Sequence, residues 1–372
     1  MSFNFVVDAI DEKTGARACS YNTHHGTIKT PVFAPVGTAA TVKALSPRDL
    51  QEIGATLVLA NTYHLRLRPG DELIRDLGGL HKFMAWDQPI LTDSGGYQVF
   101  SLTKSRKVDE NGVTFRSHID GSEHEFTPEL AMRFQENLGA DIIMCFDECA
   151  PPYDREYSKA AMIRTHKWAE RCLLAKTRSD QALFGIVQGG IFDDLRSESA
   201  QHLKDLGFGG YAIGGLSVGE KKSEMYQVTA SVCTVLPYDA PRYLMGVGTP
   251  EDLVQCVLRG VDIFDCVLPT RLGRNGAALV HGGRINLRNS KWKNSGDPIS
   301  QSCSCYTCSH FCAAYLRHLT NTNEILGHHL ISLHNVHFLI DLTKQMRSAI
   351  VGQRFKQFAD DYLRAYPEDV FQ

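Results

Sequence analysis

The amino-acid sequence predicts an α/β protein with alternating strands and helices, a (β/α)8 barrel. Five short apolar segments each stop at a polar or glycine position, namely Asp93, Asp147, Gln188, Gly214 and Asp265. Such segments between turn residues are typical of parallel strands that are buried on both faces. Because parallel strands end on the same side of a sheet, these five positions are expected to meet where a (β/α)8 barrel has its active site.

The expected strands are segments 57–60, 90–92, 142–146, 184–187, 211–213 and 261–264. Three expected helices begin with a hydroxyl residue, a proline and an acid, which are strong helix-start signals. They start at Ser46-Pro47, Thr127-Pro128 and Thr249-Pro250, and they end before Gly54, Gly139 and Gly260. Segments 155–176, 198–206 and 222–236 are expected to be further helices.

Three regions break this alternation. Residues 1–35 alternate polar and apolar positions between turn signals, which predicts an antiparallel hairpin before the barrel. Residues 103–126 are polar and rich in Gly, Asp and Ser, so they predict a long excursion of the kind that often acts as a lid. Residues 282–345 carry a metal-binding signature. No linker divides the chain, and residues 1–372 are expected to form one domain that includes this third region.

The bulk composition is typical of a globular protein. The 372 residues are 43% hydrophobic and carry a net charge of -3, which argues against a wholly basic nucleic-acid coat but allows a local basic face. The N-terminus lacks the features of a signal peptide, and no apolar run is long enough to span a membrane. Most of the eleven cysteines are scattered singly, as in a reducing cytosol. We therefore expect a cytoplasmic protein with no membrane partner.

A cysteine cluster predicts a metal site. Cys303, Cys305 and Cys308 fall within six residues, and His334 follows in an apolar segment that is expected to be helical. Thiolate and imidazole ligands favour zinc, and four protein ligands favour a structural rather than a catalytic site. Spacing alone leaves the fourth ligand open between His334 and its neighbours Cys312, His310 and His337.

A basic stretch runs from residue 266 to residue 296, without an acidic side chain. Its cations are Arg271, Arg274, Arg284, Arg288, Lys291 and Lys293. Such a stretch in a net-acidic protein suggests a phosphate-binding face, although charge runs are more often simply solvated.

The polar strand tips suggest a particular chemistry. Asp93 and Asp265 at converging strand ends suit acid/base work together with nucleophilic attack, as in cleavage of a glycosidic bond with retention. Asp147, Gln188 and Gly215 suit a guanine-like base, whose ring N–H and amino groups a carboxylate accepts and whose carbonyl oxygen needs donors. Tyr97 and Met245 could cover the two faces of the ring.

Together these residues resemble the tRNA-guanine transglycosylases, the queuine tRNA-ribosyltransferase family, over nearly the whole chain. The matching motifs are Asp93-Ser94-Gly95-Gly96-Tyr97-Gln98, Phe146-Asp147-Glu148-Cys149, Gly185-Ile186-Val187-Gln188-Gly189-Gly190, Gly214-Gly215-Leu216-Ser217-Val218-Gly219-Glu220 and Phe264-Asp265-Cys266-Val267-Leu268-Pro269-Thr270-Arg271. The cysteine cluster followed by a histidine completes the set. The resemblance implies an irregular (β/α)8 barrel with an inserted C-terminal zinc-binding subdomain, and a homodimer.

The resemblance also implies roles for individual residues. Asp265 resembles the nucleophile that attacks the ribose and expels guanine, and Asp93 resembles the general acid and base. The base-recognition set corresponds to Asp147, Gln188, Gly215 and Leu216, with Tyr97 and Met245 as the stacking pair. Arg271 and Arg274 correspond to positions that hold the tRNA anticodon loop. The zinc ligands correspond to Cys303, Cys305, Cys308 and His334, with one structural Zn²⁺ per chain.

The implied reaction exchanges the wobble guanine of tRNAs with a GUN anticodon for 7-aminomethyl-7-deazaguanine, in queuosine biosynthesis. Val218 and Cys149 are similar to the bacterial branch of the family, which uses this base. A glycoside hydrolase would explain the two acids but neither the guanine-shaped set nor the basic stretch. A non-catalytic RNA-binding subunit would lack the acids that this chain retains.

Overall fold

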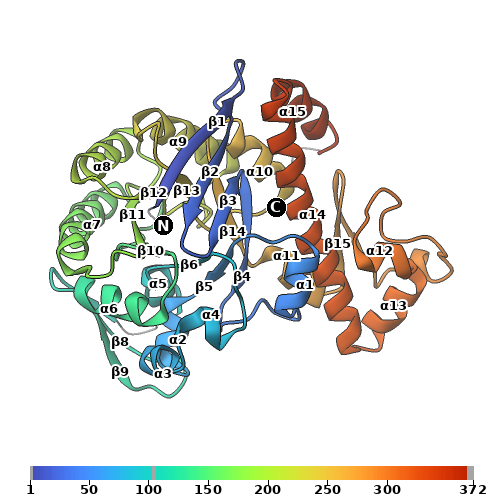
Figure 1. Ribbon diagram of the computed structural model, residues 1–372, viewed down its shortest axis with the longest axis horizontal. Coiled ribbons are helices and arrows are strands. Elements are labelled where there is room, and N and C mark those ends of the chain that lie inside the picture. The colour runs from blue at the N-terminus through green and yellow to red at the C-terminus, as the bar shows by residue number, and fades with distance from the viewer. Residues whose placement is uncertain (1–2, 103–105, 367–372) are drawn as a thin grey trace.

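The computed structural model describes residues 3–102 and 106–366 of the chain. Within these ranges, eight parallel strands close into a barrel in the order β10-β11-β12-β13-β14-β4-β5-β6 (Figure 1). The strands are β4 (Val32–Gly37), β5 (Val58–Ala60), β6 (Ile90–Thr92), β10 (Ile142–Met144), β11 (Ala182–Val187), β12 (Gly210–Ile213), β13 (Arg242–Leu244) and β14 (Ile263–Cys266). The predicted α/β barrel is therefore confirmed.

Helices connect consecutive strands on the outside of the barrel. They are α1 (Pro47–Glu52), α2 (Thr62–Leu67), α3 (Asp71–Asp76), α4 (Gly79–Phe83), α6 (Pro128–Leu138), α7 (Arg155–Ala175), α8 (Asp193–Leu206), α9 (Lys222–Val235) and α10 (Pro250–Val257). The cap signals act as expected in α6, where the Thr127 side chain accepts from the Leu130 N–H and Gly139 ends the helix at φ 75°. Buried apolar residues of these helices and of the barrel strands form one hydrophobic core.

The N-terminal region differs from the predicted hairpin. It forms a three-stranded antiparallel sheet of β1 (Asn4–Ile10), β2 (Arg17–Thr23) and β3 (Gly26–Thr30). Only Pro31 separates β3 from the first barrel strand, so the sheet leads into the barrel without a loop. Arg17 donates to Asp262, which precedes β14, with an Nε–Oδ1 distance of 2.9 Å. The sheet thus covers the N-terminal end of the barrel, opposite the predicted active site.

The predicted excursion after the Asp93 strand is an ordered unit in its described part, while residues 103–105 lie outside the description. It follows α5 (Gly96–Leu102) and forms an antiparallel sheet of β7 (Arg106–Val108), β8 (Val113–Arg116) and β9 (Glu123–Phe126). Phe115 and Phe126 are buried against Tyr63. The carbonyl oxygen of Glu110 accepts from Trp168 Nε1 on α7 at 3.0 Å. A lid function for this unit stays a prediction.

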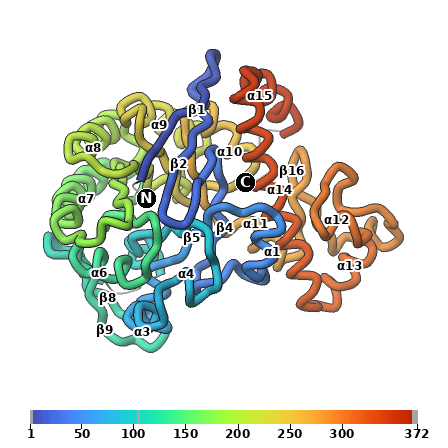
Figure 2. Tube along the Cα trace, viewed as in Figure 1, coloured from blue at the N-terminus to red at the C-terminus, as the bar shows by residue number. Residues whose placement is uncertain are grey.

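The C-terminal part projects to one side of the barrel (Figure 2). Its elements are α11 (Leu268–Arg274), β15 (Ala277–Val280), β16 (Gly283–Asn286), η1 (Ser290–Trp292), α12 (Tyr306–His310), α13 (Ala313–Asn321), α14 (Ile325–Val351) and α15 (Phe355–Leu363). The long helix α14 contacts β4, α11 and α12, so it joins this part to the barrel. In the described ranges, none of the helices has the length and apolar character needed to cross a membrane.

Candidate active site

A pocket of about 590 Å³ opens at the carboxyl ends of the barrel strands. Nine of the residues predicted from sequence line it: Asp93, Tyr97, Asp147, Gly215, Leu216, Met245, Asp265, Arg271 and Arg274. They come from strands and loops far apart in the chain, and the closed barrel brings them together. Gln188 does not line the pocket, but its side-chain amide donates a hydrogen bond to Asp147.

Asp265 lies near the end of β14 and is buried. Its Oδ1 accepts from the Tyr243 hydroxyl at 2.5 Å and from the Gly246 N–H at 2.8 Å. Within the described part of the chain, Oδ2 accepts no hydrogen bond. Burial raises the pKa of Asp265, and these two donors oppose the rise. One carboxyl oxygen is therefore anchored, and the other can engage a ligand.

Asp93 follows β6 directly and is 7% exposed. Its oxygens accept from the Asn61 side-chain amide and from the Thr62 N–H, the latter at 2.9 Å. Burial raises the pKa of Asp93 to about 7, and the nearby negative charge of Asp265 contributes to the rise. A carboxyl group with this pKa can both donate and accept a proton near neutral pH.

Asp147 lies three residues beyond β10 and is also buried. It accepts from Ser94 Oγ at 2.7 Å and from Gln188 Nε2 at 2.7 Å. Burial raises the pKa of Asp147. The Gln188 amide, expected to face a base carbonyl, thus donates to Asp147 instead, and its Oε1 is buried without a hydrogen-bond partner among the described residues.

Two glycines allow the chain to pass close to Asp147 and Gln188. A Cβ at Gly96 would lie 2.5 Å from the Asp147 carbonyl oxygen. A Cβ at Gly215 would lie 2.4 Å from Gln188 Oε1, and Gly215 has φ 64°, in the left-handed region that favours glycine. Tyr97 is half exposed and Met245 is partly buried, both at the pocket wall.

Several residues of the site were not assigned a role from sequence. Asn61 and Ser94 stand at or beside strand tips, a signal that could have identified them. Tyr243 belongs to β13, a strand that was not predicted because it begins with an arginine and so lacks an apolar run. Its hydroxyl reaches Asp265 only through the tertiary fold.

Two arginines of the basic stretch reach the pocket from α11, the helix that follows β14. Burial lowers the pKa of Arg274, and the neighbouring charge of Arg271 contributes. Arg274 Nη1 is buried without a hydrogen-bond partner in the described ranges. A buried guanidinium nitrogen without a partner at a pocket wall is suited to an anionic ligand.

The predicted metal cluster also forms. Cys303, Cys305, Cys308 and His334 have their ligand atoms within 4.8 Å of one another. The Sγ atom of Cys308 lies 3.3 Å from His334 Nδ1. The other imidazole nitrogen of His334 lies 2.8 Å from the Leu279 carbonyl oxygen, which leaves Nδ1 as the ligand atom. Three thiolates and one imidazole in this arrangement can hold a metal ion.

The alternative ligands lie outside this group. His337 Nδ1 is 3.7 Å from Cys303 Sγ, and His310 Nδ1 is 2.9 Å from the Tyr306 carbonyl oxygen. A second group of metal-type side chains, His25, His81 and Asp141, lies at the N-terminal end of the barrel. Here the Asp141 carboxylate already contacts both imidazoles, His25 Nδ1 at 2.9 Å and His81 Nε2 at 3.2 Å.

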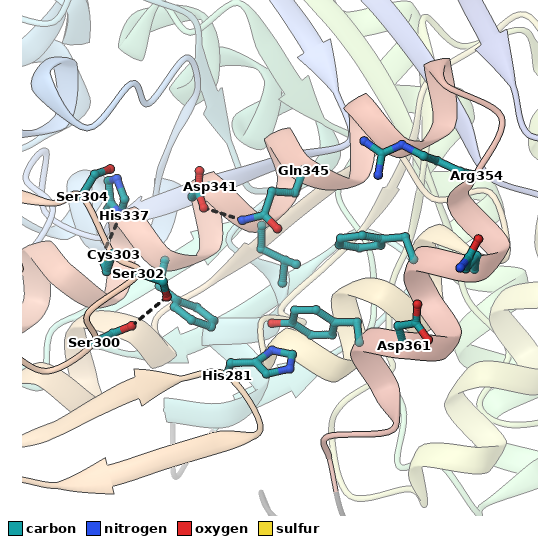
Figure 3. Close-up of a pocket in the computed structure, with 15 residues that line it drawn as sticks. His281, Ser300, Ser302, Cys303, Ser304, His337, Asp341, Gln345, Arg354 and Asp361 are labelled. Carbon is teal, nitrogen blue, oxygen red and sulfur yellow. Dashed lines mark hydrogen bonds between the residues drawn. The ribbon is translucent and has the colours of Figure 1, made fainter.

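Another pocket, of about 640 Å³, lies between α14, α15 and the turn of the β15–β16 hairpin (Figure 3). Its acids are Asp341, which accepts from Gln345 at 2.6 Å, and the exposed Asp361. Neither is a buried carboxyl group beside a second one. Although its volume is similar, this pocket is therefore a poorer active-site candidate than the pocket at the strand ends, which three buried acids line.

The fold and the site define a class of enzyme. A (β/α)8 barrel with two buried acids at its strand tips is typical of an enzyme that makes and breaks glycosidic bonds. The family model for queuine tRNA-ribosyltransferase matches residues 11–368. The chain therefore belongs to the queuine tRNA-ribosyltransferase family, whose members are pentosyltransferases.

Individual relatives agree with the family match. The queuine tRNA-ribosyltransferase of Pelotomaculum thermopropionicum is 56% identical over 370 residues, which cover 99% of this chain and all of that protein. That of Herpetosiphon aurantiacus is 57% identical over 366 residues, 98% of this chain and 93% of the relative. That of Desulforamulus reducens is 52% identical over 367 residues, 98% of this chain and 99% of the relative.

Proposed function

We propose that this enzyme exchanges the wobble guanine of tRNAs with a GUN anticodon for 7-aminomethyl-7-deazaguanine, by double displacement through a covalent Asp265–tRNA intermediate. The observation that carries the proposal is that Asp93, Asp265 and Asp147 line one pocket. Two acids suit the chemistry at the sugar, and the third suits recognition of the base. A loop nucleotide can be splayed out of the anticodon to enter such a pocket.

In the first step, the Oδ2 atom of Asp265 attacks C1′ of the ribose. The bond between C1′ and N9 of guanine breaks, and its electron pair leaves with the base. Asp93 gives its proton to the departing guanine, which a carboxyl group with a pKa of about 7 can do near neutral pH. Asp265 then forms an ester with the sugar, and the Tyr243 hydroxyl and Gly246 N–H remain on its other oxygen.

In the second step, the deazaguanine enters and Asp93, now ionised, takes the proton from its N9. This nitrogen attacks C1′, and the ester bond to Asp265 breaks. Two successive inversions retain the configuration at the sugar. Atoms and charges balance without a redox or nucleotide cofactor.

Asp147 reads the ring N–H and amino group of the base, and the Gly215 and Leu216 backbone and Gln188 serve its other polar edge. Tyr97 and Met245 cover the ring faces. Val218 and Cys149, which also line the pocket, favour 7-aminomethyl-7-deazaguanine over a bulkier base. Arg271 and Arg274 hold phosphates of the anticodon loop.

We further propose that the cluster of Cys303, Cys305, Cys308 and His334 holds one structural Zn²⁺ per chain, within a subdomain of residues 282–345. Its four protein ligands leave no open position for a substrate. The ion would tie α12 to α14 and fix the support of the basic stretch. We also propose that residues 1–372 act as one catalytic domain and that the enzyme is a cytoplasmic homodimer.

Base incorporation tests the proposed function. Purified enzyme is mixed with tRNA of a GUN anticodon and radiolabelled 7-aminomethyl-7-deazaguanine, and the label in precipitated tRNA is counted. We expect incorporation by the wild type and a loss of at least about 10³-fold in Asp265→Asn, because an amide cannot displace the base. The matched control is Asp341→Asn in the other pocket, which should retain wild-type activity. Wild-type incorporation into tRNA without a wobble guanine, or normal activity of Asp265→Asn, would contradict the proposal.

A further inference from the structure

Among the residues that the structure describes, Arg196 is a completely buried cation that forms no ion pair. It lies near the N-terminal end of α8 and has an exposed fraction of 0%. In the described ranges, no carboxylate lies within ion-pair distance of its guanidinium. Burial lowers the pKa of Arg196 to about 10, so the side chain stays charged at neutral pH. A buried, unpaired charge near the positive end of a helix is costly, and its retention calls for a specific reason.

The guanidinium donates hydrogen bonds to backbone carbonyl oxygens at the ends of two neighbouring strands. It donates to Val187, the last residue of β11, at 2.9 Å and to Gly190 in the following loop at 2.7 Å. After β12 it donates to Gly214 at 2.7 Å and to Gly215 at 3.3 Å. One side chain thus ties the loop behind Gln188 to the loop that forms a wall of the active-site pocket.

These bonds fix the direction of two further groups. In a trans peptide the C=O and the following N–H point in opposite directions within one plane. Because the Gly214 and Gly215 carbonyls point at Arg196, the N–H groups of Gly215 and Leu216 point away from it. Both residues line the pocket, and Arg196 does not. Neither N–H donates a hydrogen bond within the part of the chain that the structure describes.

We propose that Arg196 is a positioning residue for the base, which holds the Gly215 and Leu216 N–H groups toward the carbonyl edge of the bound purine. This inference rests on the proposed function and deepens it. Arg196 touches neither the base nor the sugar, and it acts through the two peptides.

The planar guanidinium group of arginine is required to contact all of these carbonyl oxygens at once. A guanidinium offers five donors in fixed directions, whereas a lysine ammonium offers three on a single atom. Arg196→Lys keeps the charge but loses several of the carbonyl contacts, and Arg196→Met loses all of them. The two substitutions should therefore form a graded series.

Steady-state kinetics, with the incoming base as the varied substrate, test the inference. The KM for 7-aminomethyl-7-deazaguanine should rise about tenfold in Arg196→Lys and further in Arg196→Met, as expected when hydrogen bonds to the base are misaligned. The matched controls are Arg242→Lys and Arg242→Met. Arg242 is also buried and donates to backbone carbonyls, including that of Leu236 at 3.2 Å, but it lies at the opposite end of the barrel. The controls should lose stability without a change in KM.

Competitive inhibition separates the role of the carbonyl edge from general loosening of the pocket. Guanine should inhibit Arg196→Lys about tenfold more weakly than the wild type, whereas 2-aminopurine, which lacks the carbonyl oxygen, should inhibit both equally. An unchanged KM in both Arg196 variants, or an equal loss for guanine and 2-aminopurine, would overturn the inference. Absence of incorporation by the wild type would instead refute the proposed function.

Discussion

Three buried carboxyl groups share one pocket, and their surroundings differ. Asp265 has one oxygen anchored by Tyr243 and Gly246, whereas both oxygens of Asp93 accept hydrogen bonds. Asp147 is held between Ser94 and Gln188. Sequence patterns predicted these acids because each follows an apolar strand. Their pKa values depend on burial and on the charges of the other acids in the pocket. Neither can be predicted from the residues next to each acid in the sequence.

The raised pKa of Asp93 has a consequence for stability. Its folded-state pKa is about 7, above the ordinary value of 3.8, so the folded protein binds this proton more tightly than the unfolded chain does. The contribution of Asp93 to folding stability is therefore greatest below about pH 4, and it is lost as the pH rises toward 7. Asp93→Asn, which never ionises, should gain up to roughly 4 kcal/mol over the wild type at pH 8. Little of this gain should appear at pH 4.

Denaturant unfolding of both proteins at several pH values measures this difference. Asp361→Asn, a substitution at an exposed acid on α15, serves as the control and should show no such trend. A stability difference between Asp93→Asn and the wild type that is the same at pH 4 and pH 8 would show that Asp93 ionises normally in the folded protein.

At the scale of helices and strands, the sequence predicted features that depend on neighbouring residues, such as helix caps. It did not predict features that depend on contacts between distant segments. The hydroxyl, proline and acid pattern located the starts of α1, α6 and α10 because a cap is formed within one turn. The strands β4 and β13 were missed, because β4 follows β3 after a single residue and β13 begins with an arginine instead of an apolar residue. The excursion was located, but its pairing as β7, β8 and β9 depends on contacts with Tyr63 and α7.

The cysteine cluster joins three elements, which gives the metal a structural consequence. Cys305 and Cys308 lie at α12, His334 lies on α14, and its second nitrogen contacts β15. Because metal binding contributes folding free energy, its removal should loosen this part of the molecule. We expect Cys305→Ser to lose the bound zinc and to lower the melting temperature by about 5 °C or more.

Cys312→Ser offers a matched control, since Cys312 is a neighbouring thiol outside the cluster. It should retain one zinc ion per chain, as measured by atomic absorption, and the wild-type melting temperature. Equal metal content in the two variants would refute the assignment of the ligands, and an unchanged melting temperature of a zinc-free Cys305→Ser would refute a structural role.

At the scale of the whole molecule, the barrel converts sequence-distant residues into one site. Asp93 directly follows β6 and Asp265 lies on β14, and these two strands are separated in the barrel by β5 and β4. The rule that parallel strands end on one side predicted their convergence. It could not predict Asn61 and Tyr243 as their partners, or the hydrogen bonds from Arg196 to the Gly214 and Gly215 carbonyls, because these contacts arise from side-chain packing across the closed fold.

The most direct test of the account is the covalent intermediate. Enzyme and tRNA are mixed without the incoming base, denatured, and resolved by gel electrophoresis, and the modified peptide is identified by mass spectrometry. We predict a slowly migrating protein–RNA band that maps to Asp265, disappears when 7-aminomethyl-7-deazaguanine is added, and is absent in Asp265→Asn. An active enzyme whose adduct maps to another residue, or whose adduct survives in Asp265→Asn, would contradict the account.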